Sequence, residues 1–348
     1  MPTVLVTGAT GFIGHRLVAL LLEQGVRVRC LVRPTSGIDR LRSWGAELYV
    51  GDVTDRDSLP SAFEGVDIVY HLAGVTKALD REVMIRVNEL GARHVAEACA
   101  AQATPPVLVA VSSLAAAGPC AIDRLRNESD PPRPVSVYGR SKRAGEVAMH
   151  SLAHRVPITI VRPPIVFGEG DADMLAMIRP IVRFRFHAVP GFTAQRFSLI
   201  HADDLAQGLV LAAQRGQRLR AAPASEANDT SASPETWDAS GYYFLAHDEH
   251  PTYDELGRRI ARAADIRGVL AVPFPRAFTW IVGAAGEMTA RWRGAPTIMN
   301  LDKAREATAG SWACSSKKAH DELGFAPAAE LDQRLRETIC WYREQRWL

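Results

Sequence analysis

The chain has 348 residues, with 41 basic and 39 acidic side chains and a formal net charge of +2. This near-neutral balance gives no reason to expect nucleic acid or an anionic membrane surface as a partner. The apolar fraction of 47% and the charged fraction of 23% are ordinary for a globular protein, and the length suffices for one large domain or two modest ones.

Residues Met1–Gly8 read as a strand that enters a turn, so we expect no secretory signal. No run approaches the roughly 18 apolar residues that a membrane-spanning helix needs. The cysteines lie far apart and form no CxxC pair, which favours small buried thiols in a reducing cytoplasm over a metal site. They are Cys30, Cys99, Cys120, Cys314 and Cys340. We therefore expect a cytoplasmic protein that binds no metal.

Short apolar runs rich in β-branched residues alternate with segments of helical period as far as residue 162. The runs that we expect to be strands are Val4–Thr7, Val26–Val32, Glu47–Val50, Asp67–His71, Val107–Ser112 and Ile158–Arg162. Phe12–Glu23 and Glu82–Cys99 are helical segments between them. Near-continuous apolar strands suit a sheet that is covered on both faces. The alternation predicts an α/β fold with a Rossmann-type, doubly wound parallel sheet.

The pattern loosens after Gly168, and the second half is mixed α/β. The elements expected there are helices over Met174–Arg183, Asp203–Arg215, Tyr253–Ala264 and Ala329–Arg346, and strands over Phe197–Ile200 and Gly241–Ala246. Residues 217–240, rich in Ala, Ser, Asp, Pro and Thr, predict an exposed, mobile loop. We expect residues 1–168, with contributions from 197–215 and 241–246, to bind a dinucleotide. Residues 169–348 are expected to form mainly a smaller substrate-binding lid.

A glycine-rich loop follows the first expected strand. Gly8 permits the tight turn, Gly11 lets a pyrophosphate approach the backbone, and Gly14 allows close packing of the helix that opens at Phe12 and Ile13. The N-terminus of that helix offers unpaired N–H groups and a positive dipole end to phosphate. Because the loop lies between a strand and a helix, it predicts a dinucleotide site.

The end of the second expected strand bears on which dinucleotide is bound. NAD sites place Asp or Glu there for the ribose 2′-hydroxyl, but this chain has Val32 followed by Arg33, with Ser36 close behind. A guanidinium pairs well with a 2′-phosphate. The sequence therefore favours NADP(H), with NAD(H) as the second choice.

Three polar residues have the order and spacing of a carbonyl-reducing site. Ser113 follows the fifth expected strand, at the edge where parallel sheets bind ligands. Tyr138 and Lys142 lie four residues apart on the expected helix over 137–154, and so share one face. A serine hydroxyl can hydrogen-bond the developing oxyanion and a tyrosine can protonate it. A neighbouring ammonium lowers the pKa of a phenol, so we predict Ser113, Tyr138 and Lys142 as the catalytic residues.

These residues, in this order, are similar to the extended short-chain dehydrogenase/reductases, the epimerase/dehydratase-like superfamily. The resemblance covers nearly the whole chain. It rests on Thr7–Gly14, Gly51-Asp52, His71–Gly74, Asn88 with Gly91, Ser112-Ser113, Tyr138 with Lys142, Arg162–Gly168 and Phe197–Asp204. The Leu31-Val32-Arg33 ending resembles the reductase-like and hydroxysteroid-dehydrogenase-like branches, whereas sugar-nucleotide epimerases usually have an acidic residue there.

The resemblance also implies further cofactor contacts and about seven parallel strands. Asp52 and Val53 are expected near the adenine, Leu72 and Ala73 along the cofactor, and Asn88 in support of the cofactor loops. Pro163, Ile165 and Val166 are expected to line the nicotinamide, and Tyr138 and Lys142 to contact the cofactor as well as the substrate.

Three functions remain open at this point. The first is an NADP(H)-dependent oxidoreductase that interconverts a ketone and a secondary alcohol. The second is a nucleotide-sugar epimerase or dehydratase that retains NAD through its cycle. The third is a dinucleotide-binding scaffold without turnover, which the intact Ser113, Tyr138 and Lys142 disfavour.

The sequence says less about the substrate and the assembly. The segment Phe274–Trp292 is bulky and apolar, and is either a pocket for an apolar small molecule or the core of the lid. A homodimer is expected through the helices over Glu82–Cys99 and 137–154. Their outward faces are expected to carry Ala92, Ala96, Ala144 and Ala148.

Overall fold

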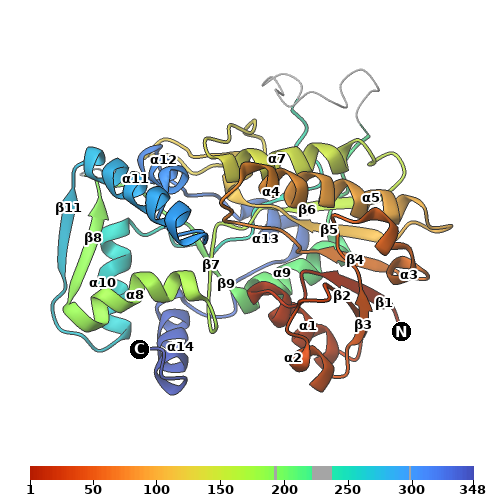
Figure 1. Ribbon diagram of the computed structural model, residues 1–348, viewed down its shortest axis with the longest axis horizontal. Coiled ribbons are helices and arrows are strands. Elements are labelled where there is room, and N and C mark those ends of the chain that lie inside the picture. Colours follow the sequence, from red (N-terminus) through yellow and green to blue (C-terminus); the bar gives the residue numbers. More distant parts are fainter. Residues whose placement is uncertain (192–193, 222–236, 298) are drawn as a thin grey trace.

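The computed structural model describes residues 1–191, 194–221, 237–297 and 299–348. A seven-stranded sheet forms its centre, in the order β3-β2-β1-β4-β5-β6-β10 (Figure 1). Its strands are β1 (Thr3–Thr7), β2 (Arg27–Val32), β3 (Glu47–Val50), β4 (Ile68–His71), β5 (Val107–Val111), β6 (Ile158–Val161) and β10 (Tyr242–Tyr243). Every neighbouring pair is parallel. The strand order reverses between β1 and β4, and ligands of such sheets bind in the crevice beyond the carboxyl ends of those strands.

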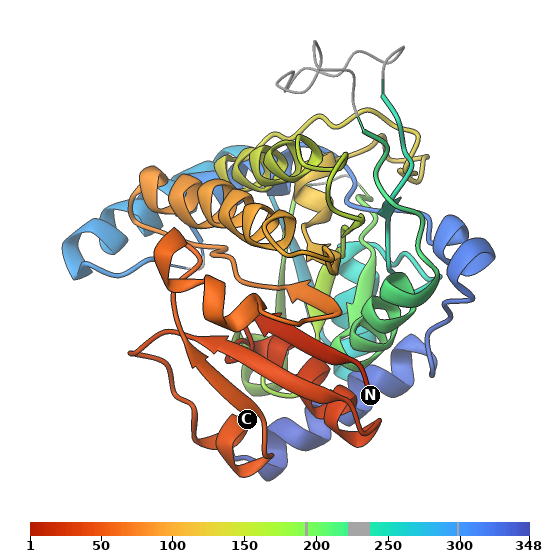
Figure 2. The ribbon, with the colours of Figure 1, turned by 90° about the vertical axis from the view of Figure 1, so that its right-hand side faces the viewer.

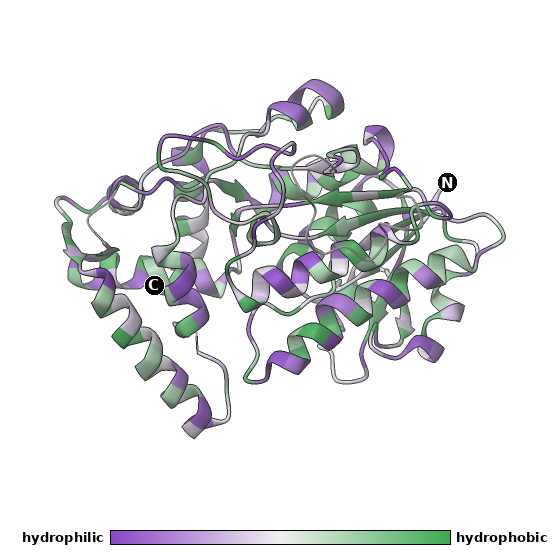
Figure 3. Cartoon of the chain, turned by 90° about the horizontal axis from the view of Figure 1, so that it is seen from above, coloured by the Kyte–Doolittle hydropathy of each residue, from purple (hydrophilic) through white to green (hydrophobic). Residues whose placement is uncertain are grey.

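Helices cover both faces of the sheet, which explains why its strands are apolar on both sides (Figures 1 and 2). One face is packed by α1 (Phe12–Glu23), α2 (Asp39–Ser43), α9 (Ala202–Arg215) and α13 (Lys317–Leu323). The other is packed by α3 (Pro60–Phe63), α5 (Gly91–Ala100) and α7 (Val137–His150). In Figure 3 the central strands are largely hydrophobic, and the helices around them alternate in hydropathy. The predicted Rossmann-type sheet is confirmed.

Two predicted helices and one predicted strand differ in extent from the elements of the structure. The stretch over 82–99 is a chain of α4 (Arg81–Ile85), a π-helical segment (Arg86–Leu90) and α5. The helix over 137–154 ends at His150, and the strand over 241–246 is only Tyr242–Tyr243. Short elements that the sequence did not suggest include a 3-10 turn (Arg56–Ser58), α2, α3 and α6 (Leu114–Ala117).

The second half of the chain forms a smaller mixed region beside the sheet (Figure 1). Its helices are α8 (Ala172–Phe184), α10 (Tyr253–Ala263), α11 (Arg276–Arg293), α12 (Leu301–Thr308) and α14 (Leu331–Glu344). Parallel pairs join β8 (Phe186–Pro190) to β11 (Leu270–Phe274), and β7 (Ile165–Phe167) to β9 (Leu199–His201). Helices α8, α10 and α14 share one apolar core, which includes Ile178, Ile260 and Leu335. Within the described ranges, no helix combines the length and apolar character needed to cross a membrane.

The ends of the predicted loop 217–240 contain no helix or strand, and Gln217, Arg220 and Ala221 are exposed, but two of its side chains pack on the protein. Leu219 is 5% exposed, and the ring of Trp237 lies 4.8 Å from that of Tyr242 in the sheet. Residues 222–236, on which most of that prediction falls, lie outside the described residues.

The predicted outward alanine face of the dimer helices is wrong for three of its four residues, and only Ala144 is partly exposed. Ala92, Ala96 and Ala148 are at most 2% exposed, because α5 and α7 use small residues to pack against each other and the sheet. A Cβ on Gly145 would lie 2.2 Å from the carbonyl oxygen of Asn88. Small side chains therefore serve packing within one chain here.

The segment Phe274–Trp292 does not form a core. Helix α11 leaves most of its large apolar side chains at the surface, and Trp292 is 86% exposed. Only Thr279, Gly283 and Ala290 of this helix are buried.

Candidate active site

The glycine loop between β1 and α1 is a close-packed turn. Gly8 has φ +72°, and its carbonyl oxygen accepts the N–H of Gly11 at 3.0 Å. A Cβ on Gly8 would lie 2.6 Å from the backbone nitrogen of Ala73, and one on Gly14 would lie 2.2 Å from the Gly8 oxygen. These positions have no room for any other residue, so glycine is required by the backbone.

Helix α1 begins directly after this loop without a side-chain cap. Gly11 is its N-cap residue, and Phe12 and Ile13 open its first turn. Unpaired N–H groups at a helix N-terminus bind anions. A loop without side chains next to such a terminus fits the pyrophosphate of a dinucleotide.

Arg33 is the first residue after β2, beyond the buried Val32. Its carbonyl oxygen accepts the N–H of Ser36 at 3.0 Å, so the chain turns away at once. The side chain is exposed and forms no ion pair among the described residues. Strands β1 and β2 are in register here, with Thr7 opposite Leu31, which places Arg33 near the glycine loop.

The ends of β3 and β4 carry the other residues expected near the adenosine. The carboxylate of Asp52 accepts both the N–H and the hydroxyl of Thr54, at 2.8 and 2.9 Å. Val53 is 6% exposed and contacts Gly91, which makes it a packing residue at this edge. Leu72 and Ala73 lie against Gly8, so their backbone forms one wall of the glycine loop.

Asn88 connects the loop after β4 to α7 through hydrogen bonds. Its amide exchanges two 2.9 Å hydrogen bonds with the backbone of Val75 and donates a third, also 2.9 Å, to the hydroxyl of Ser141. It lies in the π-helical segment, and such segments are frequent at functional sites. Asn88 therefore fixes the loop after β4 relative to α7.

The structure brings Ser113 and Tyr138 together at the carboxyl end of β5. The hydroxyl of Ser113 accepts the N–H of Ala115 at 3.1 Å, which leaves its own proton free to donate. Burial raises the pKa of Tyr138, while a hydrogen bond with Ser113 and the charge of Lys303 lower it. Both hydroxyls thus face the same small region.

Lys142 lies one helical turn beyond Tyr138 and points toward Gly74, in the loop after β4. Its ammonium donates to the carbonyl oxygen of Val111 at 3.0 Å, and a Cβ on Gly74 would lie 2.9 Å from Nζ. Burial lowers the pKa of Lys142 to about 8, against the opposing charge of Glu146. In this structure the ammonium that lowers the pKa of Tyr138 belongs to Lys303, where the sequence pointed to Lys142.

Helix α12 supplies residues that the sequence did not suggest. The carboxylate of Asp302 accepts the N–H groups of Val137 and Tyr138, at 2.7 and 3.1 Å. The Nζ of Lys303 lies 5.9 Å from the centre of the Tyr138 ring and 2.7 Å from a carboxylate oxygen of Glu306. No sequence motif links these residues to Tyr138, because their proximity depends on how the second half folds back.

A buried ionic network connects the strands and the helix that carry Ser113, Tyr138 and Lys142. Glu146 accepts two hydrogen bonds from the guanidinium of Arg162, at 2.8 and 2.6 Å, and a third from the hydroxyl of Ser112 at 2.5 Å. Arg143 adds a contact of 3.2 Å. Burial acts to raise the pKa of Glu146, but the two arginines and Ser112 hold it below its usual range. The network joins β5, β6 and α7, which carry the site.

The loop between β6 and β7 faces the same region. The carbonyl oxygen of Pro163 accepts the N–H of Leu114 at 2.8 Å, next to Ser113. Ile165 is 38% exposed and Val166 half-buried. This placement suits the residues that were expected to line a nicotinamide.

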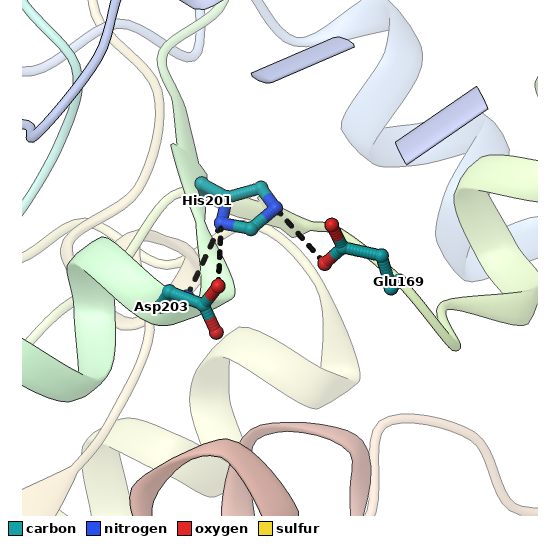
Figure 4. A group of neighbouring side chains, drawn as sticks. All are labelled: Glu169, His201 and Asp203. Atoms are coloured by element: carbon teal, nitrogen blue, oxygen red, sulfur yellow. Dashed lines mark hydrogen bonds and ion pairs between the residues drawn. The ribbon is translucent and has the colours of Figure 1, made fainter. Parts of the chain in front are cut away.

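A cluster of Glu169, His201 and Asp203 lies after β7 and β9 (Figure 4). The Nδ1 of His201 accepts the N–H of Asp203 at 3.3 Å, so its protonated Nε2 faces Glu169, also at 3.3 Å. Arg16 of α1 already pairs with Glu169 at 2.7 Å and with Asp203 at 3.5 Å. Burial acts to raise the pKa of Glu169, yet His201 and Arg16 bring it to about 2. With its carboxylates paired to arginine, the cluster joins β7 and β9 to α1.

This fold and glycine loop define a dinucleotide-binding α/β protein of the Rossmann type. The family described as NAD dependent epimerase/dehydratase matches residues 4–223, and the chain belongs to this family.

Known relatives extend over nearly the whole chain. It is 31% identical to "Ceramide reductase" of Caulobacter vibrioides, over 99% of this chain and 96% of that protein. It is 28% identical to "Sterol demethylase protein B" of Methylococcus capsulatus, over 99% of both chains. A "ketoreductase" of Stigmatella aurantiaca, whose name includes a farnesyl-dihydroquinoline-1-oxide, is 29% identical over 61% of this chain and 64% of that protein.

Solved structures show the same architecture. The crystal structure of gox2253 has a TM-score of 0.76 and 26% identity, and the match covers 99% of both chains. UDP-glucose 4-epimerase of Thermotoga maritima, solved with UDP-glucose, has a TM-score of 0.73 over 99% of both chains. At 18% identity that likeness shows the fold alone.

Proposed function

We propose that this protein is an NADP(H)-dependent oxidoreductase that interconverts a ketone and a secondary alcohol. The observation that carries the proposal is the convergence of three groups at one sheet edge. The side chain of Ser113 acts to lower the pKa of Tyr138, and the ammonium of Lys142 lies beside the backbone of Gly74. Gly74 follows Leu72 and Ala73, whose backbone adjoins the glycine loop, so a dinucleotide and a carbonyl can meet there.

The roles of the three residues follow from their chemistry. When bound, the nicotinamide ring supplies or accepts the hydride. Tyr138 gives its phenolic proton to the carbonyl oxygen, and Ser113 donates a hydrogen bond that orients this oxygen. Lys142 binds the nicotinamide ribose, while the charge of Lys303 favours the phenolate form of Tyr138 in the reverse reaction.

We propose the following cofactor contacts, which extend from the pyrophosphate to the nicotinamide. They are Gly8, Gly11, Phe12, Ile13, Gly14, Arg33, Asp52, Val53, Leu72, Ala73, Asn88, Tyr138, Lys142, Pro163, Ile165 and Val166. Within this set Val53 acts through packing and Asn88 through the loop that it holds. In the proposed division, residues 1–168 with 197–215 and 241–246 bind the dinucleotide, and 169–348 mainly form the lid.

The preference for NADP(H) rests on Val32 and Arg33. Val32 is buried and uncharged where a carboxylate would repel a 2′-phosphate, and Arg33, which follows it, has an exposed side chain. Arginine recognises phosphate with two parallel hydrogen bonds. The same position in an NAD enzyme usually holds an acidic residue.

An apolar ketone is the substrate class that we propose. Relatives named for ceramide, a sterol and a farnesyl-bearing quinoline support it. The test is oxidation of NADPH with a panel of long-chain and polycyclic ketones. Tyr138→Phe keeps the ring and removes the proton donor, so turnover should fall by roughly 10²–10⁴-fold while NADPH binding survives. Near-full activity in this variant would contradict the role of Tyr138.

An epimerase or dehydratase is the second candidate, favoured by the family to which the chain belongs. Such an enzyme uses transient oxidation and keeps its cofactor through the cycle, so it should purify with NAD(H) bound. A reductase releases its cofactor each turn, and measurement of the bound dinucleotide on the purified protein separates the two.

A homodimer and a cytoplasmic location complete the proposal. Ile85 and Leu90, each 39% exposed, line a groove of about 450 Å³ on the outer side of the α4–α5 stretch, a surface that a second copy can cover. Light scattering at micromolar concentration tests the dimer, and a monomer would contradict it. The five cysteines are unpaired, which suits a reducing compartment.

A further inference from the structure

Helix α11 packs on the protein through a stripe of small residues. A Cβ on Gly286 would lie 1.9 Å from the carbonyl oxygen of Met299, and one on Gly283 would lie 2.9 Å from the side chain of Ala304. Thr279 and Ala290 complete the buried side. Because this side is so small, the neighbouring segment lies against the helix backbone, and the larger side chains point elsewhere.

The side of α11 that faces away from the protein is apolar. Ile281 is 64% exposed, Met288 72% and Trp292 86%, with the exposed Ala284 and Ala285 between them. These residues recur every three or four positions, opposite Gly283 and Gly286. Single exposed apolar residues are ordinary, but a continuous stripe marks an interaction surface.

Positive charge flanks this stripe. Arg276, Arg291 and Arg293 are exposed, and the one acidic residue of the helix, Glu287, lies 3.4 Å from Arg291. Residues 266–300 contain four arginines and one glutamate, a net charge of +3, whereas the whole chain has +2. The rest of the chain is therefore slightly negative, so the excess charge is concentrated around α11.

The helix is also prominent in the outline of the molecule. In Figure 2, α11 (light blue) extends beyond the rest of the chain, and Figure 3 shows it running outward from the lid. A flat surface can reach it without contact with the central sheet.

We propose that α11 docks on an anionic phospholipid membrane, with Ile281, Met288 and Trp292 inserted at the interface. Interfacial helices combine an apolar face with Trp and flanking Arg, which this helix has. Tryptophan favours the headgroup level, and arginine is attracted to acidic lipid headgroups. The positive flanks argue for this occupant over a second copy of the chain, whose own α11 would bring the same charge to the contact.

Docking at α11 places the membrane close to the catalytic helix. The chain passes from α11 through Thr297–Asn300 into α12, whose Asp302 and Lys303 contact or face Tyr138. An apolar ketone dissolved in the bilayer then has a short path to the site. Docking does not depend on the proposed reaction, because vesicle binding is measured without turnover.

The experiment is sedimentation of the full chain with vesicles of phosphatidylcholine alone or with phosphatidylglycerol. We expect binding to the phosphatidylglycerol vesicles that weakens as salt is added. The double change Met288→Ser and Trp292→Ser should weaken binding at least about tenfold. Removal of a single arginine, Arg291→Gln or Arg293→Gln, should weaken it about fivefold.

The matched control is Val50→Ser, which removes another exposed apolar residue, 66% exposed, from the far edge of the sheet. It should leave vesicle binding unchanged. The proposal is overturned if the wild type does not bind the anionic vesicles, or if the α11 variants bind as well as Val50→Ser. It is also overturned if Met288→Ser with Trp292→Ser instead turns a dimer into a monomer, since the stripe would then be a contact between copies.

Discussion

The backbone N–H of Tyr138 donates a hydrogen bond of 3.1 Å to the carboxylate of Asp302, a residue 164 positions further along the chain. The same carboxylate accepts the N–H of Val137 at 2.7 Å. A negative charge at a helix N-terminus is favourable, so Asp302 stabilises the first turn of α7. The second half of the chain thereby holds the helix that carries Tyr138.

Removal of this cap should loosen the catalytic helix. We expect Asp302→Ala to lower the free energy of unfolding by about 1 kcal/mol, as for other N-terminal caps. It should also reduce kcat, because Tyr138 is the second residue of α7. Denaturant titration and steady-state kinetics measure the two effects. Asp302→Asn keeps an oxygen acceptor and should recover part of both, whereas equal losses in the two variants would show that charge alone matters.

Lys303 should set the pH range in which Tyr138 works. Its ammonium lowers the pKa of Tyr138, and the nearby Glu306 raises it. Lys303→Met therefore raises the pKa of Tyr138, and the rising limb of alcohol oxidation, which needs the phenolate, should move to higher pH. Lys303→Arg keeps the charge and should keep the profile. If the rising limb of the pH profile stays at the same pH in Lys303→Met, Lys303 does not affect the pKa of Tyr138.

The affinity for NADPH should fall in alkaline solution. Burial lowers the pKa of Lys142 to about 8, so its ammonium is largely lost above that pH in the free protein. If the charged form binds the cofactor, Kd should rise about tenfold for each pH unit above 8 and stay flat below it. Fluorescence titration between pH 6 and pH 10 measures this curve. Lys142→Met should bind NADPH more weakly, with a Kd that no longer rises above pH 8. If the rise of Kd persists in this variant, it is due to another titrating group.

The network around Glu146 should be a major support of the fold. Glu146→Ala leaves the fully buried guanidinium of Arg162 without a counter-charge. Breaking a buried pair in this way costs roughly 3–5 kcal/mol, a large share of the stability of an ordinary domain. The surface variant Glu337→Ala, which removes a half-exposed partner of Arg334, should cost at most about 1 kcal/mol. Similar melting curves for the two variants would rule out this role.

The sequence predicted the sheet and the glycine loop because both depend on local pattern. Apolar runs identify strands buried on both faces, and Gly8 and Gly14 are fixed by contacts within a few residues or with the adjacent strand. Ser113, Tyr138 and Lys142 could be found in the same way, because the strand end and the helical spacing place them. Their catalytic roles remain predictions of the sequence.

What the sequence could not predict depends on packing between distant segments. Asp302 and Lys303 reach Tyr138 only because the chain after α11 returns to the catalytic helix. The orientation of α11 also escaped prediction, since its apolar residues are typical of a core and its small packing side is visible only in three dimensions. The net charge of the chain also did not reveal the local excess of arginine around α11, because it sums the charges of the whole surface.

The central claim is a reductase that prefers NADP(H), and titration of the purified protein with NADPH and NADH at one ionic strength tests it most directly. A charge-assisted hydrogen bond from Arg33 to the 2′-phosphate contributes about 1.5–3 kcal/mol, which is roughly a ten- to hundredfold preference for NADPH. Arg33→Ala should remove most of that preference and leave NADH binding nearly intact, and Val32→Asp should reverse it. Binding of NADH as tight as that of NADPH, or NAD(H) retained on the purified chain, would contradict the account and favour the epimerase.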